Sequence, residues 1–235
     1  MLNFLKKRSS QLEIMDDFLC NGKVVDQTLR ELHAINTYLG GNQISITAFQ
    51  KLIKDKKHEN YSLVDLGCGG GDTLILFSNW AKKNNVHLKL VGVDANKYIT
   101  DYASQNCSSV SNISIISENI FSEKFNSEHF DVAHASLFLH HFTDAEIISL
   151  LRQLMDQVKI GIIINDLHRH PISYYFTKWI LTRWSKSEMV KFDSVVSVAR
   201  SFTRKELESY LQTAGINNYS LKWKWAFRWE LIIRK

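Results

Sequence analysis

The sequence has little proline and little cysteine, and this scarcity excludes two classes of protein. Its single proline, Pro171, leaves no Pro-rich linker between domains. Its three cysteines are Cys20, Cys68 and Cys107, an odd number at wide spacing without a C-x-x-C pair. Neither a disulfide framework nor a zinc site follows from such a set, and we expect a reducing, cytoplasmic environment.

Long apolar runs are missing as well. No uncharged apolar stretch reaches the roughly 18 residues of a membrane span, and the opening MLNFLKKRSS has no apolar run of signal-peptide length behind its basic cluster. We therefore expect no membrane span. The net charge of +5 comes from Lys and Arg spread along the chain rather than gathered in one patch. This pattern gives little support to a nucleic-acid partner, and it leaves weak association with an anionic surface open.

The sequence does contain enough apolar material for one sizeable core. With 235 residues, of which 45% are hydrophobic, we expect one main domain with a small cap. Helical patterns cover residues 11–20, 24–39 and 44–57. Gly40 and Gly41 are a C-cap signal, and the charged stretch KDKKHEN reads as a joint. We predict an N-terminal helical cap at 1–60, followed by a second domain at 61–235.

From residue 61 onward, short β-rich runs alternate with helical stretches. The runs are YSLVDLG, HLKLVGVD, ISIISEN, HFDVAHASL and VKIGIIINDL. Strands that alternate with helices predict an α/β fold, with a parallel sheet between two layers of helices. Later, Thr203 and Glu206 stand at capping-box spacing before a helix that ends at Gly215. Residues 217–235 read as two closing strands.

The stretch VDLGCGGGDT joins the first of these strands to a helix. A glycine-rich turn at this place, with Asp94 ending the next strand, is typical of a nucleotide-type site, because glycines permit close approach and a carboxylate binds a ribose diol. Dinucleotide binding requires G-x-G-x-x-G, but Asp72 stands at the third glycine position. Its carboxylate would compete with a pyrophosphate for the positive end of the helix.

The arrangement Asp65-x-Gly67-x-Gly69-x-Gly71 instead resembles motif I of class I S-adenosylmethionine (SAM) methyltransferases, and the resemblance covers roughly residues 61–235. LVGVDAN resembles the second motif of this family, and SENIFSEKFNSEHFDVAHASLFLHHF resembles its third and fourth motifs. The resemblance implies SAM as cofactor and a Rossmann-like, mostly parallel sheet of seven strands with the last strand antiparallel. The cofactor-binding residues that it implies are Asp65, Gly67, Gly69, Gly71, Asp94, Ala95, Asn96, Glu118, Asn119, Ile120 and Ser136.

The acceptor is indicated less directly. The sequence HASLFLHH stands where enzymes that methylate base amino groups often carry an N/D-P-P-Y type sequence, which argues against that chemistry. After the fifth strand, an aromatic helix places Tyr175, Phe176 and Trp179 at the ligand-binding edge of the sheet. These residues can be simple packing, a lid over the acceptor or a contact with a membrane surface.

The helical prefix, with MDDF and ELHAINTYLGG, and the aromatic helix together resemble small-molecule methyltransferases of aromatic polyketide, pigment and quinone-type pathways. By this resemblance, both segments cover the pocket, and Tyr175, Phe176, Trp179 and Asp16 bind the acceptor. Aromatic side chains suit a flat, apolar molecule.

A phenolic acceptor would benefit from a catalytic base. The candidates are the four histidines near the sheet edge, namely His140, His141, His168 and His170. We prefer His168, because Asp166 stands close enough in sequence to orient its ring. For His140, in the apolar run SLFLHHF, we expect burial to lower the imidazole pKa. The neighbouring His141 is interpreted as structural, and no metal site is predicted.

These observations lead to one hypothesis with three rivals. We expect a SAM-dependent methyltransferase that acts at oxygen on a small, hydroxylated aromatic acceptor. The rivals are C-methylation of a quinol-like ring, methylation of RNA, and non-catalytic SAM binding. The sequence does not name the acceptor or indicate an oligomeric state.

Overall fold

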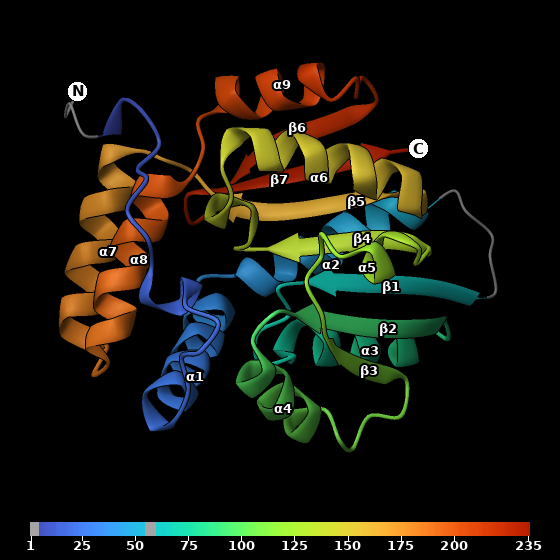
Figure 1. Ribbon diagram of the computed structural model, residues 1–235, viewed down its shortest axis with the longest axis horizontal. Coiled ribbons are helices and arrows are strands. Elements are labelled where there is room, and N and C mark those ends of the chain that lie inside the picture. The colour runs from blue at the N-terminus through green and yellow to red at the C-terminus, as the bar shows by residue number, and fades with distance from the viewer. Residues whose placement is uncertain (1–4, 55–59) are drawn as a thin grey trace.

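In the computed structural model, which describes residues 5–54 and 60–235, seven strands form one sheet in the order β3-β2-β1-β4-β5-β7-β6 (Figure 1). All neighbouring strands are parallel except β7, which is antiparallel to both β5 and β6. This topology confirms the predicted Rossmann-like sheet with an antiparallel last strand. The strands are β1 (Asn60–Leu66), β2 (His87–Asp94), β3 (Ile113–Ser117), β4 (Phe130–Ser136), β5 (Val158–Leu167), β6 (Tyr219–Lys224) and β7 (Arg228–Arg234).

Most helices begin where the local sequence supplies a cap. Thr143 and Glu206, for example, belong to two complete capping boxes, at the start of α6 and of α9. The helices are α1 (Lys23–Tyr38), α2 (Gly41–Ile53), α3 (Asp72–Lys83), α4 (Lys97–Asn106), α5 (Glu123–Asn126), α6 (Asp144–Gln157), α7 (Pro171–Trp184), α8 (Glu188–Arg200) and α9 (Arg204–Thr213).

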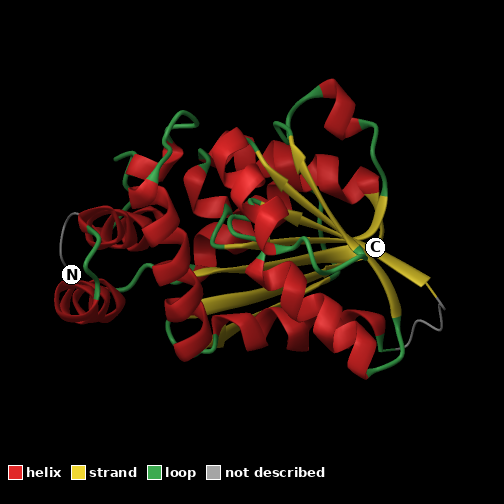
Figure 2. Ribbon diagram, turned by 90° about the horizontal axis from the view of Figure 1, so that it is seen from below, coloured by secondary structure: helices red, strands yellow, loops and turns green. Residues whose placement is uncertain are grey.

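The sheet lies between two layers of helices (Figure 2). On one face, α2 and α3 bring Phe49 and Phe77 into edge-to-face contact, with ring centroids 5.5 Å apart, over strand residues such as Leu63. On the other face, α6 and α9 pack Leu150 and Leu211 against the strands. Because both faces are covered, the central strands β1, β4 and β5 are buried along most of their length, as central parallel strands usually are.

A third group of elements covers the carboxyl ends of the parallel strands. It consists of residues 5–39, which include α1, together with α7 and α8, and we call it the cover (Figure 1). Its parts are tied together by hydrogen bonds such as Ser9 N to Ala199 O at 2.9 Å. The third predicted helix of the cap, α2, packs on the sheet instead. The proposed boundary at 60–61 follows residues 55–59 of the KDKKHEN joint, which lie outside the described residues.

The helix expected at residues 11–20 is wrong. This segment is irregular apart from one short 3₁₀ turn at Ile14–Asp16. The reason is a long-range contact, because the Asp193 carboxylate on α8 accepts hydrogen bonds from the main-chain N–H groups of Ile14 and Met15 at 2.7 and 3.2 Å. None of the helices in the described ranges is long and apolar enough to cross a membrane.

Candidate functional site

The glycine-rich turn after β1 leaves no room for larger residues. Gly67 has a φ of +64°, and a Cβ atom there would lie 2.2 Å from a ring carbon of Phe138. Gly71, with a φ of +77°, precedes α3, and a Cβ atom there would lie 2.6 Å from the sulfur of Cys107. The two positions require glycine for different reasons. Gly67 keeps the turn open under Phe138, whereas Gly71 lets α4 pack against it.

Asp94 closes the opposite side of this turn. Its carboxylate accepts hydrogen bonds from the main-chain N–H groups of Asn96 at 3.0 Å and of Gly69 at 3.4 Å. Burial raises the pKa of Asp94, and the two N–H groups act in the opposite direction. The side chain of Asn96 accepts hydrogen bonds from Tyr98 N and Ile99 N and so caps α4. A buried carboxylate is thus held in place beside the glycine turn.

Asp65 is tied into the sheet. Its Oδ1 atom lies 2.6 Å from Nδ1 of His134, the residue beside it on β4. The other ring nitrogen of His134 lies 2.8 Å from the hydroxyl of Ser45 on α2. This chain of polar contacts fixes the end of β1 from the neighbouring strand and from the helix layer.

One cavity of about 1040 Å³ lies between the sheet edge and the cover. Of the eleven predicted cofactor residues, ten line it, and the exception among the described residues is Gly71. The ten are Asp65, Gly67, Gly69, Asp94, Ala95, Asn96, Glu118, Asn119, Ile120 and Ser136. Beneath the cover, the same cavity continues between aromatic and aliphatic side chains of α1, α7 and α8. A single space therefore joins the glycine turn to a largely apolar compartment.

His140 lies at the junction of these two parts of the cavity. Its Nδ1 is 2.7 Å from Oδ1 of Asp166 at the end of β5, and its Nε2 is 3.4 Å from Oε1 of Glu13. Burial disfavours the charged ring, yet the negative charges of Asp166 and Glu13 raise the pKa of His140 to about 10. The expectation of a lowered pKa is wrong, because the buried partners are carboxylates rather than apolar side chains.

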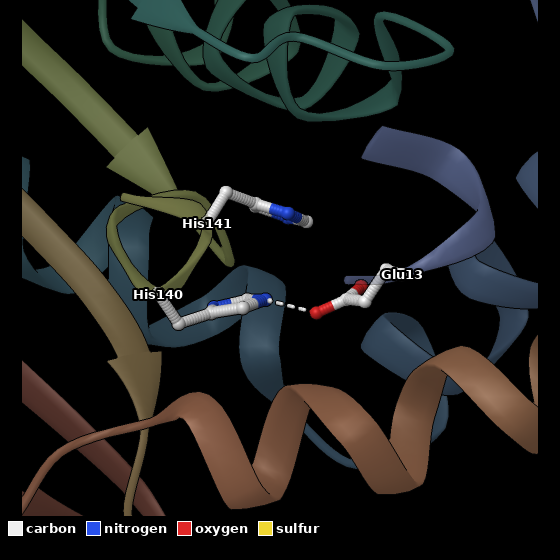
Figure 3. Close-up of side chains that lie close together, drawn as sticks. All are labelled: Glu13, His140 and His141. Atoms are coloured by element: carbon white, nitrogen blue, oxygen red, sulfur yellow. Dashed lines mark ion pairs between the residues drawn. The ribbon is translucent and has the colours of Figure 1, made fainter. Parts of the chain in front are cut away.

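Glu13 and His141 complete this cluster (Figure 3). Figure 3 shows the two histidines side by side on the loop after β4, with Glu13 facing them from the N-terminal segment. His141 Nδ1 lies 2.6 Å from Oδ1 of Asp16, and Arg200 also donates to the Asp16 carboxylate. Asp16, predicted to bind the acceptor, thus lines the cavity and joins the cover to this loop.

The cluster has the composition of a metal site. Glu13, His140 and His141 each present one ligand atom, and these atoms lie within 4.8 Å of one another. Two histidines and one carboxylate can bind Zn²⁺ or Fe²⁺. The distance of 3.4 Å between Glu13 and His140 is also that of an ion pair, which needs no metal. The absence of a metal from this site therefore stays a prediction.

Comparisons with known proteins agree with this geometry. Residues 63–161 match a family model described as a methyltransferase domain. No curated protein matches the chain. Its fold is similar to that of a putative O-methyltransferase from Nostoc punctiforme, at 19% identity, covering 88% of this chain and 59% of that one, with a TM-score of 0.58.

Two further structures are similar at low identity. Plantazolicin methyltransferase BamL, solved with a triazolic desmethylPZN analogue and S-adenosylhomocysteine (SAH), shares 18% identity over 83% of this chain and 70% of its own, with a TM-score of 0.62. Human N-acetylserotonin methyltransferase, solved with SAM, shares 15% identity over 91% of this chain and 56% of its own, with a TM-score of 0.64. The family match thus covers residues 63–161, and the similarity of fold extends over most of the chain. The chain spans 59% of the length of the first of these relatives.

The reason for preferring His168, orientation of its ring by Asp166, is not found in the structure. Asp166 contacts His140 and not His168, and His168 is absent from the described residues that line the cavity. The His168 ring packs against Trp229, with centroids 4.8 Å apart, and its buried Nδ1 has no hydrogen-bond partner among the described residues. Burial and the neighbouring charges of His170 and Arg169 lower the pKa of His168 to about 4.

The aromatic helix contributes only part of the predicted acceptor site. Phe176 lines the cavity and lies 5.8 Å from Phe227, measured between ring centroids. Tyr175 and Trp179 are about half exposed, at 52% and 55%, and neither is among the described residues that line the cavity. Their exposure places the two residues on the outer side of α7, away from the compartment. This placement does not favour a role as a lid over the acceptor.

Four residues in or beside the cavity were not predicted from the sequence. They are Glu13, His134, Arg200 and Arg228. Only His134 carries a usable signal, because a polar residue inside the fourth strand needs a buried partner and Asp65 lies beside it. The other three depend on contacts between distant parts of the chain.

Proposed function

We propose that this protein transfers a methyl group from SAM to an oxygen atom of a small, hydroxylated aromatic acceptor. The observation that carries this proposal is the single cavity of about 1040 Å³, which runs from the glycine turn and Asp94 into the compartment beneath the cover. Its volume lies near the upper end of ordinary ligand sites, as two bound molecules would require. The relatives solved with SAM or SAH support the choice of cofactor.

The cofactor half of the cavity is assigned from the predicted cofactor residues that line it. In our proposal, Asp94 binds the ribose hydroxyls, and the main chain at Ala95 and Ile120 borders the adenine. The glycine turn lets the methionine part approach the main chain closely. Ser136 and Phe138 line the cavity wall after β4, where they would border the methyl group of bound SAM.

The acceptor half supplies alignment and charge. Holding the two reactants in line is worth up to roughly 10⁵–10⁸ M in effective concentration. In place of His168, we propose His140 as the group at the acceptor oxygen. Because its ring stays protonated at neutral pH, it donates from Nε2 to the acceptor oxygen and favours the ionised phenol, whose proton is released to solvent. The oxygen then forms a bond to the methyl carbon as the carbon–sulfur bond breaks, which leaves SAH.

The rival functions differ in what surrounds the cavity. C-methylation of a quinol-like ring would use the same cavity and differs only in which acceptor atom faces the methyl group. An RNA substrate fits less well, because the cover lies across the carboxyl edge of the sheet. The cysteines of the described ranges are free, which fits the proposed reducing, cytoplasmic setting.

Label transfer tests the proposal. We would incubate the purified protein with SAM carrying a deuterated methyl group and a panel of mono- and dihydroxylated aromatics, and analyse products by mass spectrometry and NMR. We expect one labelled methyl group on oxygen. Label on ring carbon would support C-methylation. Tight SAM binding without any labelled product would indicate a non-catalytic protein.

A further inference from the structure

Arg228 is a buried cation without an ionic partner among the described residues. This first residue of β7 is 3% exposed, and it lines the cavity. Its guanidinium donates to the side-chain oxygens of Asn36 at 2.6 Å and of Asn165 at 3.4 Å, which are both neutral. No ion pair within the described ranges includes it, and the nearby Asp166 is already paired with His140. Since burying an unpaired charge is strongly unfavourable, this arrangement calls for an anion.

A second positive group lies directly beside Arg228. A Cβ atom on Gly41, the first residue of α2, would lie 2.9 Å from the guanidinium carbon of Arg228. The guanidinium therefore lies against the N-terminal turn of a 13-residue helix, whose N-cap, Gly40, provides no side-chain acceptor. A helix N-terminus is itself positive and presents free N–H groups. Two positive groups therefore lie in contact at one place on the cavity wall, and both favour an anion beside them.

The stretch Ile35 to Gly41 builds this arrangement. Asn36, in the last turn of α1, accepts a hydrogen bond from the Arg228 guanidinium, and Gly40, with a φ of +74°, turns the chain from α1 into α2. Gly41 then leaves the space that Arg228 fills. The paired glycines thus do more than end a helix, because the second one admits a cation to the helix terminus. Next to Arg228, Phe227 and Phe176 form an aromatic wall of the cavity.

We propose that Arg228 and the N-terminus of α2 bind a carboxylate. A guanidinium and helix N–H groups are the usual partners of this group. Two molecules can bring a carboxylate into the cavity, namely an acceptor of the hydroxybenzoate type and the methionine part of SAM. The position beside Phe176 and Phe227, under the cover, favours the acceptor. That assignment rests on the proposed function, whereas the carboxylate site itself does not.

Calorimetry with small probes tests the site. The acceptor arm titrates 2,4-dihydroxybenzoate and its methyl ester into the SAH-saturated protein. The cofactor arm titrates SAH and 5′-methylthioadenosine, which lacks the amino-acid part. Each titration is run on the wild type, Arg228→Met, Arg228→Lys and the control Arg204→Met. Arg204 pairs with Glu208 on α9, so the control removes the same charge from a surface helix.

We expect Arg228→Met to weaken one carboxylate ligand by about tenfold to a hundredfold, the usual worth of a hydrogen bond to a charged group. Arg228→Lys should weaken it less, and the control should match the wild type. Loss confined to dihydroxybenzoate, with its ester unaffected, assigns the site to the acceptor. Loss confined to SAH, with methylthioadenosine unaffected, assigns it to the cofactor.

Unchanged affinity for both carboxylate ligands in Arg228→Met would overturn the proposal, as would a wild type that does not bind either of them. Thermal unfolding supplies a second readout. Because a buried charge without an ionic partner is removed, Arg228→Met should unfold at the wild-type temperature or above it in the absence of ligand. A large decrease for both Arg228 variants would show a structural residue. Failure of label transfer with intact dihydroxybenzoate binding would count against the proposed function alone.

Discussion

His140 should make the stability of the protein depend on pH in the alkaline range. Its folded-state pKa is about 10, against about 6.5 in an unfolded chain. A raised pKa contributes stability that is fully present below pH 6.5 and is lost as the pH rises toward 10. Over this window the folded protein holds one proton more than the unfolded chain, so the free energy of unfolding should fall by about 1.4 kcal/mol per pH unit.

Urea denaturation of the wild type and of His140→Gln between pH 7 and 9 measures this effect. The variant cannot take up the proton, so the difference in unfolding free energy between the two proteins should shrink by about 3 kcal/mol over these two pH units. Other titrating groups contribute equally to both proteins and cancel. A difference that stays constant with pH would show that His140 is neutral between its two carboxylates, and the proposed charge on the ring would then be wrong.

Three further predictions concern single side chains. Asp94→Ala should weaken SAM binding by about 1.5–3 kcal/mol in calorimetry, because a charge-assisted contact to the ribose is lost. Unchanged affinity would show that Asp94 does not bind the ribose. Phe176→Ala should raise the KM for an aromatic acceptor while the exposed Trp179→Ala leaves it nearly unchanged, and the reverse order would restore Trp179 as a lid. His168→Phe should reduce acid sensitivity. The pKa of His168 is lowered to about 4, so wild-type stability should decline as the pH falls from 6.5 to 4, and equal acid midpoints in urea for both proteins would contradict this.

Features of the sequence that act locally predicted most of the fold. The run VKIGIIINDL matches β5 residue for residue, because a strand buried on both faces is apolar along its centre, here Ile160 to Ile164. The capping boxes at Thr143 and Thr203 depend on residues three positions apart, and both form as expected. The motif residues of the first two strands lie on one cavity for a similar reason, since parallel strands end at the same sheet edge.

Contacts between distant residues account for what the sequence did not predict. Asp166 and His168 are neighbours in sequence, yet Asp166 turns to the loop after β4 and accepts from His140, 26 residues away. The segment at residues 11–20 has a helical pattern, but it is held in another conformation by Asp193, 179 residues from Ile14. Glu13 reaches His140 only through this segment. Periodicity and motif spacing contain no information on such partners.

Calorimetric titration of SAH and NAD into the wild type and Gly67→Val tests the central claim most directly. Gly67 lies so close to the Phe138 ring that a larger side chain at position 67 must displace the turn or the ring, and either change would alter the cofactor space. We predict that the wild type binds one SAH per chain and no NAD, and that Gly67→Val, while still unfolding cooperatively, no longer binds SAH. Binding of NAD in place of SAH, or undiminished SAH binding by Gly67→Val, would contradict a SAM site at this turn.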